Sequence, residues 1–263
     1  MCKHPWVQIP PLPFRGVAQL GRAPSLGGGC RRFKSYHPDL VTYQHFINMQ
    51  IFLDTADYRE IAERYATGLI SGITTNPTLV RKAGCNYFDF IRTLSQDFAF
   101  ESISAEVDGK DADEMIENAQ QYIKIGSEVT IKLPLTKEGL IACKILSDEG
   151  VTTNVTLCFS AAQAALAAMS GATYISPFVG RMNDNSVSGV ELVRAISGLY
   201  SVQGCTTKIL AASLRDVHHV SRCLLYGASV VTLPVGVFDK MYNHVLTDAG
   251  LAIFEKDFKE ING

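Results

Sequence analysis

The residues with the clearest chemical potential stand at the ends of short apolar runs. In Val129-Thr130-Ile131-Lys132-Leu133, polar and apolar residues alternate with the period of two that strands have. One face of this strand therefore carries Lys132, and the apolar residues lie on the other. Burial of an amine favours its neutral form, which is a nucleophile that can form a Schiff base with a carbonyl substrate. The alternative is a lysine that extends from the strand end into water.

The same alternation places other reactive groups beside this lysine. Asp54 and Glu106 end two further strand-like runs and are candidates for proton transfer. The remaining polar or inward-facing residues at strand ends are Thr74, Asn76, Asn154, Thr156, Ser176 and Phe178. The amide and hydroxyl groups among them are donors that Schiff-base chemistry on a polyol would need.

A possible phosphate site follows two later strands. Arg181 comes after the sixth strand-like run, and Ser213 and Arg215 come after the seventh, at the start of a helical pattern. Helix N-termini and guanidinium groups both bind phosphate. The alternative is that these arginines form surface ion pairs.

The elements that must position these residues alternate strictly. Strand-like runs occur at 50–54, 70–75, 102–107, 128–133, 151–157, 173–179, 207–212 and 229–233. Helical patterns occur at 57–67, 86–98, 111–125, 137–149, 160–170, 187–203, 215–226 and 237–243. Such alternation predicts an α/β fold of parallel strands, and eight units predict a (β/α)8 TIM barrel whose active site lies at the carboxyl ends of the strands. A doubly wound open sheet is the alternative, but no GxGxxG opens a helix.

An additional amphipathic helix is expected at the C-terminus, over 247–261. Leu251, Phe254, Phe258 and Ile261 lie on one of its faces. This face can pack on the chain's own barrel or against another copy of the chain.

Composition excludes several classes of protein. The chain has 263 residues, 47% of them hydrophobic, and a net charge of −2. These values argue against general disorder and against a nucleic-acid-binding face, and no apolar run is long enough to span a membrane. The seven cysteines are scattered and form no CxxC, so neither a disulfide framework nor a zinc site is indicated, and the reducing cytoplasm fits best.

Residues 1–48 differ from the rest of the chain. They hold six basic residues, one acidic residue and six of the ten prolines, with no helical or strand period. A targeting peptide and a basic arm that binds an acidic partner are two interpretations. A third is favoured: a non-native extension, since 16–35 resembles a transfer-RNA gene read as protein. We therefore predict a disordered or non-native segment over 1–48 and a barrel domain over 49–263.

Residues 49–263 resemble the small transaldolase family, which includes the fructose-6-phosphate aldolases. The resemblance rests on six pieces in order: Phe52-Leu53-Asp54-Thr55-Ala56, Gly72-Ile73-Thr74-Thr75-Asn76-Pro77, Val129-Thr130-Ile131-Lys132-Leu133-Pro134, Asn154-Val155-Thr156-Leu157, Ser176-Pro177-Phe178-Val179-Gly180-Arg181 and Ala212-Ser213-Leu214-Arg215.

The resemblance implies a Schiff-base mechanism without metal or cofactor. Lys132 would attack the carbonyl of a ketose phosphate, and Asp54 would take the proton of the carbon-4 hydroxyl. Glu106 and Thr156 would position a water that carries protons. The substrate would be held by Thr74, Asn76, Asn154, Ser176 and Phe178, and its phosphate by Arg181, Ser213 and Arg215.

The resemblance leaves two activities open. A transaldolase passes the dihydroxyacetone unit to an aldose phosphate in the non-oxidative pentose phosphate pathway, whereas an aldolase releases it. The aldolase branch carries Gln and Tyr where this chain has Glu106 and Phe178, so transaldolase is expected, although the short chain is typical of the aldolase branch. A non-catalytic sugar-phosphate-binding barrel is a third hypothesis.

Further expectations follow from the family. Its small members exchange the C-terminal helix between neighbours in ring-shaped oligomers, so a homo-oligomer, a pentamer or decamer, is expected. The expected partners are sugar phosphates, without nucleic acid or membrane, in the cytoplasm.

Overall fold

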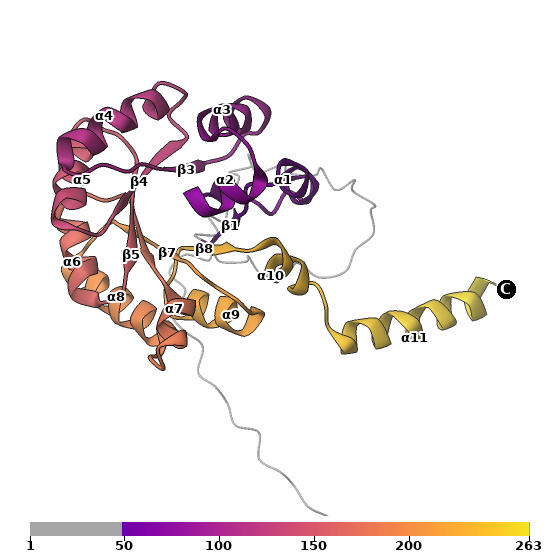
Figure 1. The fold of residues 1–263 in the computed structure, drawn as a ribbon. Coiled ribbons are helices and arrows are strands. Elements are labelled where there is room, and N and C mark those ends of the chain that lie inside the picture. Colours follow the sequence, from indigo (N-terminus) through magenta and orange to yellow (C-terminus); the bar gives the residue numbers. More distant parts are fainter. Residues whose placement is uncertain (1–48, 263) are drawn as a thin grey trace, which may run out of the picture. The chain divides into compact units, whose positions relative to one another are not determined.

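The computed structural model describes residues 49–262, and the predicted extension over 1–48 lies outside the described residues. Within this range eight parallel strands close into a barrel, each pairing with its neighbour in sequence and β8 pairing with β1 (Figure 1). The strands are β1 (Gln50–Asp54), β2 (Gly72–Thr74), β3 (Ser102–Glu106), β4 (Val129–Pro134), β5 (Thr153–Cys158), β6 (Tyr174–Pro177), β7 (Lys208–Ala211) and β8 (Val230–Leu233). The predicted (β/α)8 barrel is thus confirmed, and the open-sheet alternative is wrong.

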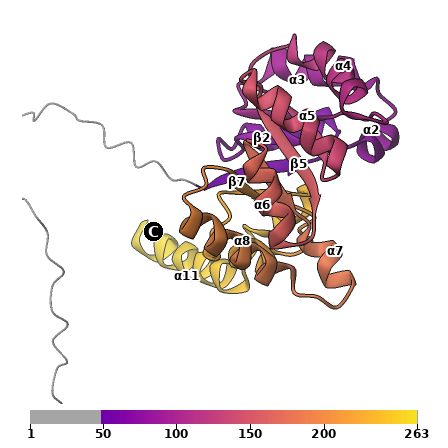
Figure 2. The same cartoon turned by 90° about the vertical axis from the view of Figure 1, so that its left-hand side faces the viewer.

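Helices connect the strands and surround the barrel. They are α1 (Tyr58–Tyr65), α2 (Pro77–Ala83), α3 (Tyr87–Asp97), α4 (Ala112–Ile123), α5 (Lys137–Asp148), α6 (Ala161–Met169), α7 (Val179–Asp184), α8 (Gly189–Gln203), α9 (Val217–Leu225), α10 (Val235–Lys240) and α11 (Val245–Asn262). Neighbouring outer helices pack side by side, as α6 and α8 do in both views (Figures 1 and 2).

Most helices begin at a polar residue that the sequence supplies at the required place. The side-chain oxygen of this residue accepts a backbone N–H of the first helical turn, which would otherwise have no partner. The capping residues of this kind are Asp57, Asn76, Asn86, Asp111, Thr136, Ser160 and Asp216.

The strands separate two layers of packed side chains. In β4, Ile131 and Leu133 point outward and are fully buried beneath the helices. The inner layer is smaller and includes Phe52 and Tyr174, whose rings meet edge to face with centroids 6.1 Å apart. Apolar side chains pack on both sides of the strands and keep the strand backbones in place. The strand that carries an inward-pointing polar side chain therefore sets the position of that side chain.

Two helices were not predicted from the sequence, and both follow strands near the carboxyl end of the barrel. α2 starts at Pro77, which enters the sequence pattern only as the end of the piece Gly72-Ile73-Thr74-Thr75-Asn76-Pro77. A proline is compatible with the first helical turn, where its missing N–H needs no partner. α7 is short and begins directly after Phe178, so the predicted strand over 173–179 ends earlier, at Pro177.

The predicted C-terminal helix is present as α11, but it contributes no buried residue. Phe254 and Phe258 are each more than half exposed. Packing of this face on the chain's own barrel is therefore absent from the described structure. None of the helices in residues 49–262 combines the length and the apolar character needed to cross a membrane.

A close backbone contact joins the ends of β6 and β7. The N–H of Gly180 donates to the carbonyl oxygen of Ser213 at 3.0 Å, and Ser213 itself has a φ of 58°. A Cβ atom on Gly180 would lie 2.1 Å from that carbonyl oxygen. Glycine at this position therefore permits α7 to start where it does.

We expect Gly180→Ala to lower the free energy of unfolding by about 1–3 kcal/mol, the usual cost of forcing atoms into a packed site. Gly236→Ala in α10 is the control, because nothing lies within 4 Å of the added methyl group. Helix propensity should make that variant about 0.5–1 kcal/mol more stable. Urea unfolding measures both, and equal stability of the two variants would contradict the close contact.

Candidate active site

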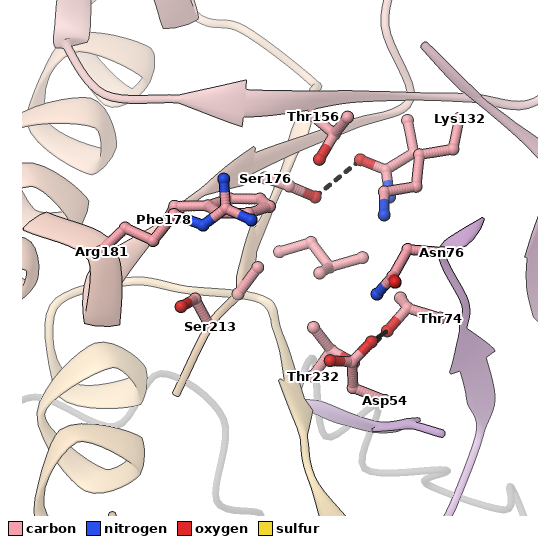
Figure 3. A pocket seen from close by; sticks show the side chains of 13 residues that line it. Asp54, Thr74, Asn76, Lys132, Thr156, Ser176, Phe178, Arg181, Ser213 and Thr232 are labelled. Atoms are coloured by element: carbon pink, nitrogen blue, oxygen red, sulfur yellow. Dashed lines mark hydrogen bonds between the residues drawn. The ribbon is translucent and has the colours of Figure 1, made fainter. Parts of the chain in front are cut away.

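A cavity lies at the carboxyl ends of the strands, as the barrel predicts (Figure 3). Ten of the residues predicted from the sequence line it: Asp54, Thr74, Asn76, Lys132, Asn154, Thr156, Ser176, Phe178, Arg181 and Ser213. Three others, Leu210, Ala212 and Thr232, were not predicted. The remaining two predicted residues, Glu106 and Arg215, lie outside this lining.

Lys132 is buried in the wall of the barrel, with 8% of its side chain exposed. The parallel register places it between Glu106 of β3 and Asn154 of β5. Its Nζ lies 2.8 Å from Oε2 of Glu106 and donates to the backbone carbonyl of Thr75 at 3.1 Å. The alternative of a lysine that extends into water is thus wrong, and Glu106 joins the site through its contact with Lys132.

Asp54 accepts a hydrogen bond from Thr74, and Thr74 is in turn supported by Thr232. Thr74 Oγ1 donates to Asp54 Oδ1 at 3.0 Å and lies 2.6 Å from Thr232 Oγ1. Since the Thr74 hydroxyl has one hydrogen and gives it to Asp54, Thr232 must be the donor in the second contact.

Burial raises the pKa of the Asp54 carboxyl above its usual range. The positive charge of Lys132 and the hydrogen bond from Thr74 oppose this change, but burial is the stronger effect. The carboxylate is consequently a stronger base than an exposed aspartate.

The opposite wall presents hydrogen-bonding groups without partners. Ser176 Oγ donates to Asn154 Oδ1 at 2.7 Å, which fixes the orientation of the amide. The amide nitrogen of Asn154 and the hydroxyl of Thr156 are buried, and neither finds a partner among the described residues. Leaving such groups unpaired costs about 1–3 kcal/mol each, so a polar ligand that pairs with them would be bound favourably.

A cationic group closes another side of the cavity. The guanidinium carbon of Arg181 lies 4.8 Å from the centroid of the Phe178 ring, at cation–π distance. Figure 3 shows Arg181 and Ser213 on the side of the view away from Lys132 and Asn76. A substrate with a carbonyl at one end and an anionic group at the other matches this separation.

Arg215 is engaged elsewhere. Its guanidinium forms an ion pair with the carboxylate of Asp184 in α7, and about half of each side chain is exposed. This is the surface ion pair that the sequence left open as the alternative. Its contact with a phosphate stays a prediction.

Thr232 could have been found from the sequence. In Val230-Val231-Thr232-Leu233 the period of two places Thr232 inward at a strand end, the same signal that marked Lys132. Leu210 and Ala212 are apolar, and no residue-type signal distinguishes an apolar residue of a cavity wall from one of the core.

The arrangement can do a definable chemistry. A buried amine lies next to one carboxylate, Glu106, and a second carboxylate of raised pKa, Asp54, lines the same cavity. Hydroxyl and amide groups face the space between them, and Arg181 lies at its border. These groups suit imine formation with a carbonyl compound that carries hydroxyls and an anionic group.

The sequence of this chain is similar to those of known proteins. Residues 51–262 match the family described as "Transaldolase/Fructose-6-phosphate aldolase". A protein of Caulobacter vibrioides (strain NA1000 / CB15N), named "Probable transaldolase", is 50% identical over 210 residues, which cover 80% of this chain and 96% of that protein. A "Probable transaldolase" of Anaeromyxobacter sp. (strain Fw109-5) is 48% identical over 213 residues, 81% of this chain and 99% of its own length. One of Methanococcus vannielii is 46% identical over 210 residues, 80% and 97% of the two chains.

The raised pKa of Asp54 predicts a stability change with a defined pH dependence. The unfolded chain releases this proton near the ordinary value of 3.8, whereas the folded protein holds it more tightly. Stability is therefore lost as the pH rises from 3.8 through the raised pKa, and the loss is complete above it. We expect Asp54→Asn to raise the free energy of unfolding at pH 7, and the gain should shrink as the pH falls towards 3.8.

Chemical denaturation at several pH values measures this effect. Asp257→Asn is the control, because Asp257 is exposed on α11. If Asp54→Asn were no more stable than this control at pH 7, burial would not be the dominant influence on Asp54.

Proposed function

We propose, from the fact that the chain belongs to the transaldolase/fructose-6-phosphate aldolase family, that this enzyme is a transaldolase. It would transfer a dihydroxyacetone unit from fructose 6-phosphate or sedoheptulose 7-phosphate to an aldose phosphate, in the non-oxidative pentose phosphate pathway. The observation that carries the proposal is the buried Lys132 ammonium, paired with Glu106 in a cavity that Asp54 and Arg181 also line.

The first step is formation of the Schiff base. Lys132 gives up one proton, and its amine then attacks carbon 2 of the ketose, so that the carbonyl oxygen becomes a hydroxyl. That hydroxyl then takes the proton that the ammonium released and leaves as water, so that a protonated imine remains on Nζ. Glu106 lies 2.8 Å from Nζ and is placed to receive the proton of the ammonium, directly or through a water next to the Thr156 hydroxyl.

Carbon–carbon cleavage follows. Asp54 takes the proton of the carbon-4 hydroxyl, and the oxygen electrons form the carbonyl of the departing aldehyde phosphate. The bond between carbons 3 and 4 breaks, and its electrons move into the imine to give an enamine on Lys132. The raised pKa of Asp54 supports this role, because a stronger base accepts the proton more readily.

Transfer reverses these steps on a second aldehyde. Carbon 3 of the enamine attacks the acceptor carbonyl, whose oxygen takes the proton back from Asp54. Water then adds to carbon 2 and releases Lys132. Asn76, Asn154 and Ser176 would hold the dihydroxyacetone hydroxyls in the meantime, and the unpaired amide nitrogen of Asn154 supports this assignment.

The phosphate would lie against Arg181 and Ser213, with Arg215 as a third contact. Arg181 already borders the cavity. Arg215 would have to exchange Asp184 for phosphate. Because an exposed ion pair contributes only about 0–1 kcal/mol, a phosphate dianion can replace the carboxylate at little cost.

The choice between transaldolase and fructose-6-phosphate aldolase depends on what happens to the enamine. Protonation of its carbon 3 would release free dihydroxyacetone. Phe178 lines the cavity but has no hydroxyl that could supply or orient a proton there. This property favours transfer and leaves the aldolase as the alternative.

We propose that the enzyme uses no cofactor and is located in the cytoplasm, as the resemblance implies. We also propose a homo-oligomer, in which a second copy covers the apolar face of α11. Phe254 and Phe258 are 61% and 64% exposed on that helix, and exposed apolar residues in such a row are typical of an interface.

The activity is tested with protein that starts at Met49. Fructose 6-phosphate is supplied with and without erythrose 4-phosphate, and release of glyceraldehyde 3-phosphate is followed. We expect release only with the acceptor; release without it would identify an aldolase.

The Schiff base is tested in the same mixture by borohydride reduction, which should add the substrate carbons to Lys132. Lys132→Ala should lower kcat by about 10⁴-fold or more. Lys137→Ala, at the exposed start of α5, is the matched control. Retained turnover in Lys132→Ala would rule out the Schiff-base mechanism at Lys132, whereas a non-catalytic sugar-phosphate-binding barrel would show no turnover even in the wild type.

Phe178→Tyr tests the distinction between the two activities. A hydroxyl added next to the enamine should raise acceptor-free cleavage relative to transfer, by roughly the 10²-fold that a positioned proton donor can contribute. The ratio of the two rates is measured on one preparation. An unchanged ratio would mean that position 178 does not decide the fate of the enamine.

A further inference from the structure

Tyr87, at the start of α3, stands outside the cavity lining and forms two hydrogen bonds at the ends of the strands that flank it. We propose that Tyr87 is a positioning residue for Lys132: its hydroxyl fixes the two groups that hold the lysine ammonium. This inference rests on the proposed Schiff-base function.

The direction of each hydrogen bond around Tyr87 can be worked out from the available hydrogens. Thr75 Oγ1 donates its single hydrogen to the carbonyl of Ser104 at 2.9 Å. In its contact with Tyr87, at 2.7 Å, Thr75 must therefore accept, and Tyr87 donates. The backbone N–H of Glu106 in turn donates to the Tyr87 oxygen at 2.7 Å.

The result is a series of three hydrogen bonds in which each hydroxyl group both donates and accepts. It runs from the N–H of Glu106 through the Tyr87 hydroxyl and the Thr75 hydroxyl to the Ser104 carbonyl. These hydrogen bonds connect the end of β3 to the segment after β2. The paired residues of β2 and β3 end at Thr74 and Ser104, so strand pairing does not hold Thr75 and Glu106 together.

These two fastened residues are the ones that Lys132 contacts. The Thr75 carbonyl and the Glu106 carboxylate accept from Lys132 Nζ, and an ammonium has three hydrogens to donate. The Tyr87 hydroxyl thus determines the backbone position of both acceptors without touching Lys132. A shift of either acceptor would turn the amine away from the direction in which it must attack.

The surroundings of Tyr87 suit this role. Its ring packs against Tyr122 of α4, with the centroids 5.7 Å apart, and Asn86 caps the helix just before it. Burial raises the pKa of Tyr87, so the phenol keeps the hydrogen that it donates to Thr75.

Tyr87→Phe removes the hydroxyl and retains the ring. We expect kcat to fall about tenfold, the scale of one hydrogen bond in a transition state, with KM within about twofold of the wild type because Tyr87 does not line the substrate cavity. Rates are expressed per competent site, counted as the fraction of chains that borohydride traps at equilibrium. A purely structural role would lower that fraction and the melting temperature but leave kcat per site unchanged.

Tyr122→Phe is the matched control. It removes a hydroxyl from the neighbouring ring, and that hydroxyl forms no hydrogen bond with the described residues. Its kcat per site should equal that of the wild type.

A second pair of variants, at Thr75, tests the next hydroxyl in this series of hydrogen bonds. These variants test the proposal independently if Tyr87→Phe does not fold. Thr75→Val should be slowed about as much as Tyr87→Phe, and Thr75→Ser, which keeps a hydroxyl, should be about tenfold faster than Thr75→Val. Combining Tyr87→Phe with Thr75→Val should cost no more than the larger single effect, because both interrupt one series of hydrogen bonds.

Three results would overturn the proposal: kcat per site of Tyr87→Phe within twofold of Tyr122→Phe, a rise of KM at unchanged kcat, or equal rates for Thr75→Val and Thr75→Ser. Failure of the proposed function is separate from these, since the wild type itself would then trap no substrate on Lys132.

Discussion

The burial of one ammonium group is the constraint on which the rest of this structure depends. Lys132 lies inside the barrel wall, where an unpaired charge would cost several kcal/mol. Two acceptors compensate for that cost, the Glu106 carboxylate and the Thr75 carbonyl. The strand register, the loop after β2 and the start of α3 must therefore keep fixed relative positions. The same two acceptors that stabilise the charge of Lys132 also fix the direction in which its amine points.

The candidate active site combines groups that lie in different environments. Glu106 lies against a positive charge and is partly exposed, while Asp54 is buried and its pKa is raised. Two carboxylates in one site can consequently take separate proton-transfer roles. On the other wall, the unpaired amide of Asn154 leaves binding capacity for a hydroxylated ligand. The pairing of Ser176 with Asn154 keeps that amide in one orientation.

The short helices α7 and α2, which follow β6 and β2, place further residues at the cavity. α7 begins directly after β6, with Gly180 against Ser213, and this start places Arg181 at the cavity. α2 begins at Pro77, and the side-chain oxygen of Asn76 caps it by accepting from the N–H of Leu79 at 3.0 Å. Each short helix thus couples a site residue to a backbone requirement of the fold.

The sequence by itself determined the alternation of strands and helices, because each strand's period of two and each helix's apolar face are local patterns. The same period identified Lys132 and most of the cavity lining, since direction along a strand follows from parity. Only the tertiary structure decided that Arg215 pairs with Asp184, that Thr232 supports Asp54 through Thr74, and that Tyr87 bridges two strand ends. These contacts join residues distant in sequence or on different elements, and their distances depend on barrel closure, which no local pattern encodes.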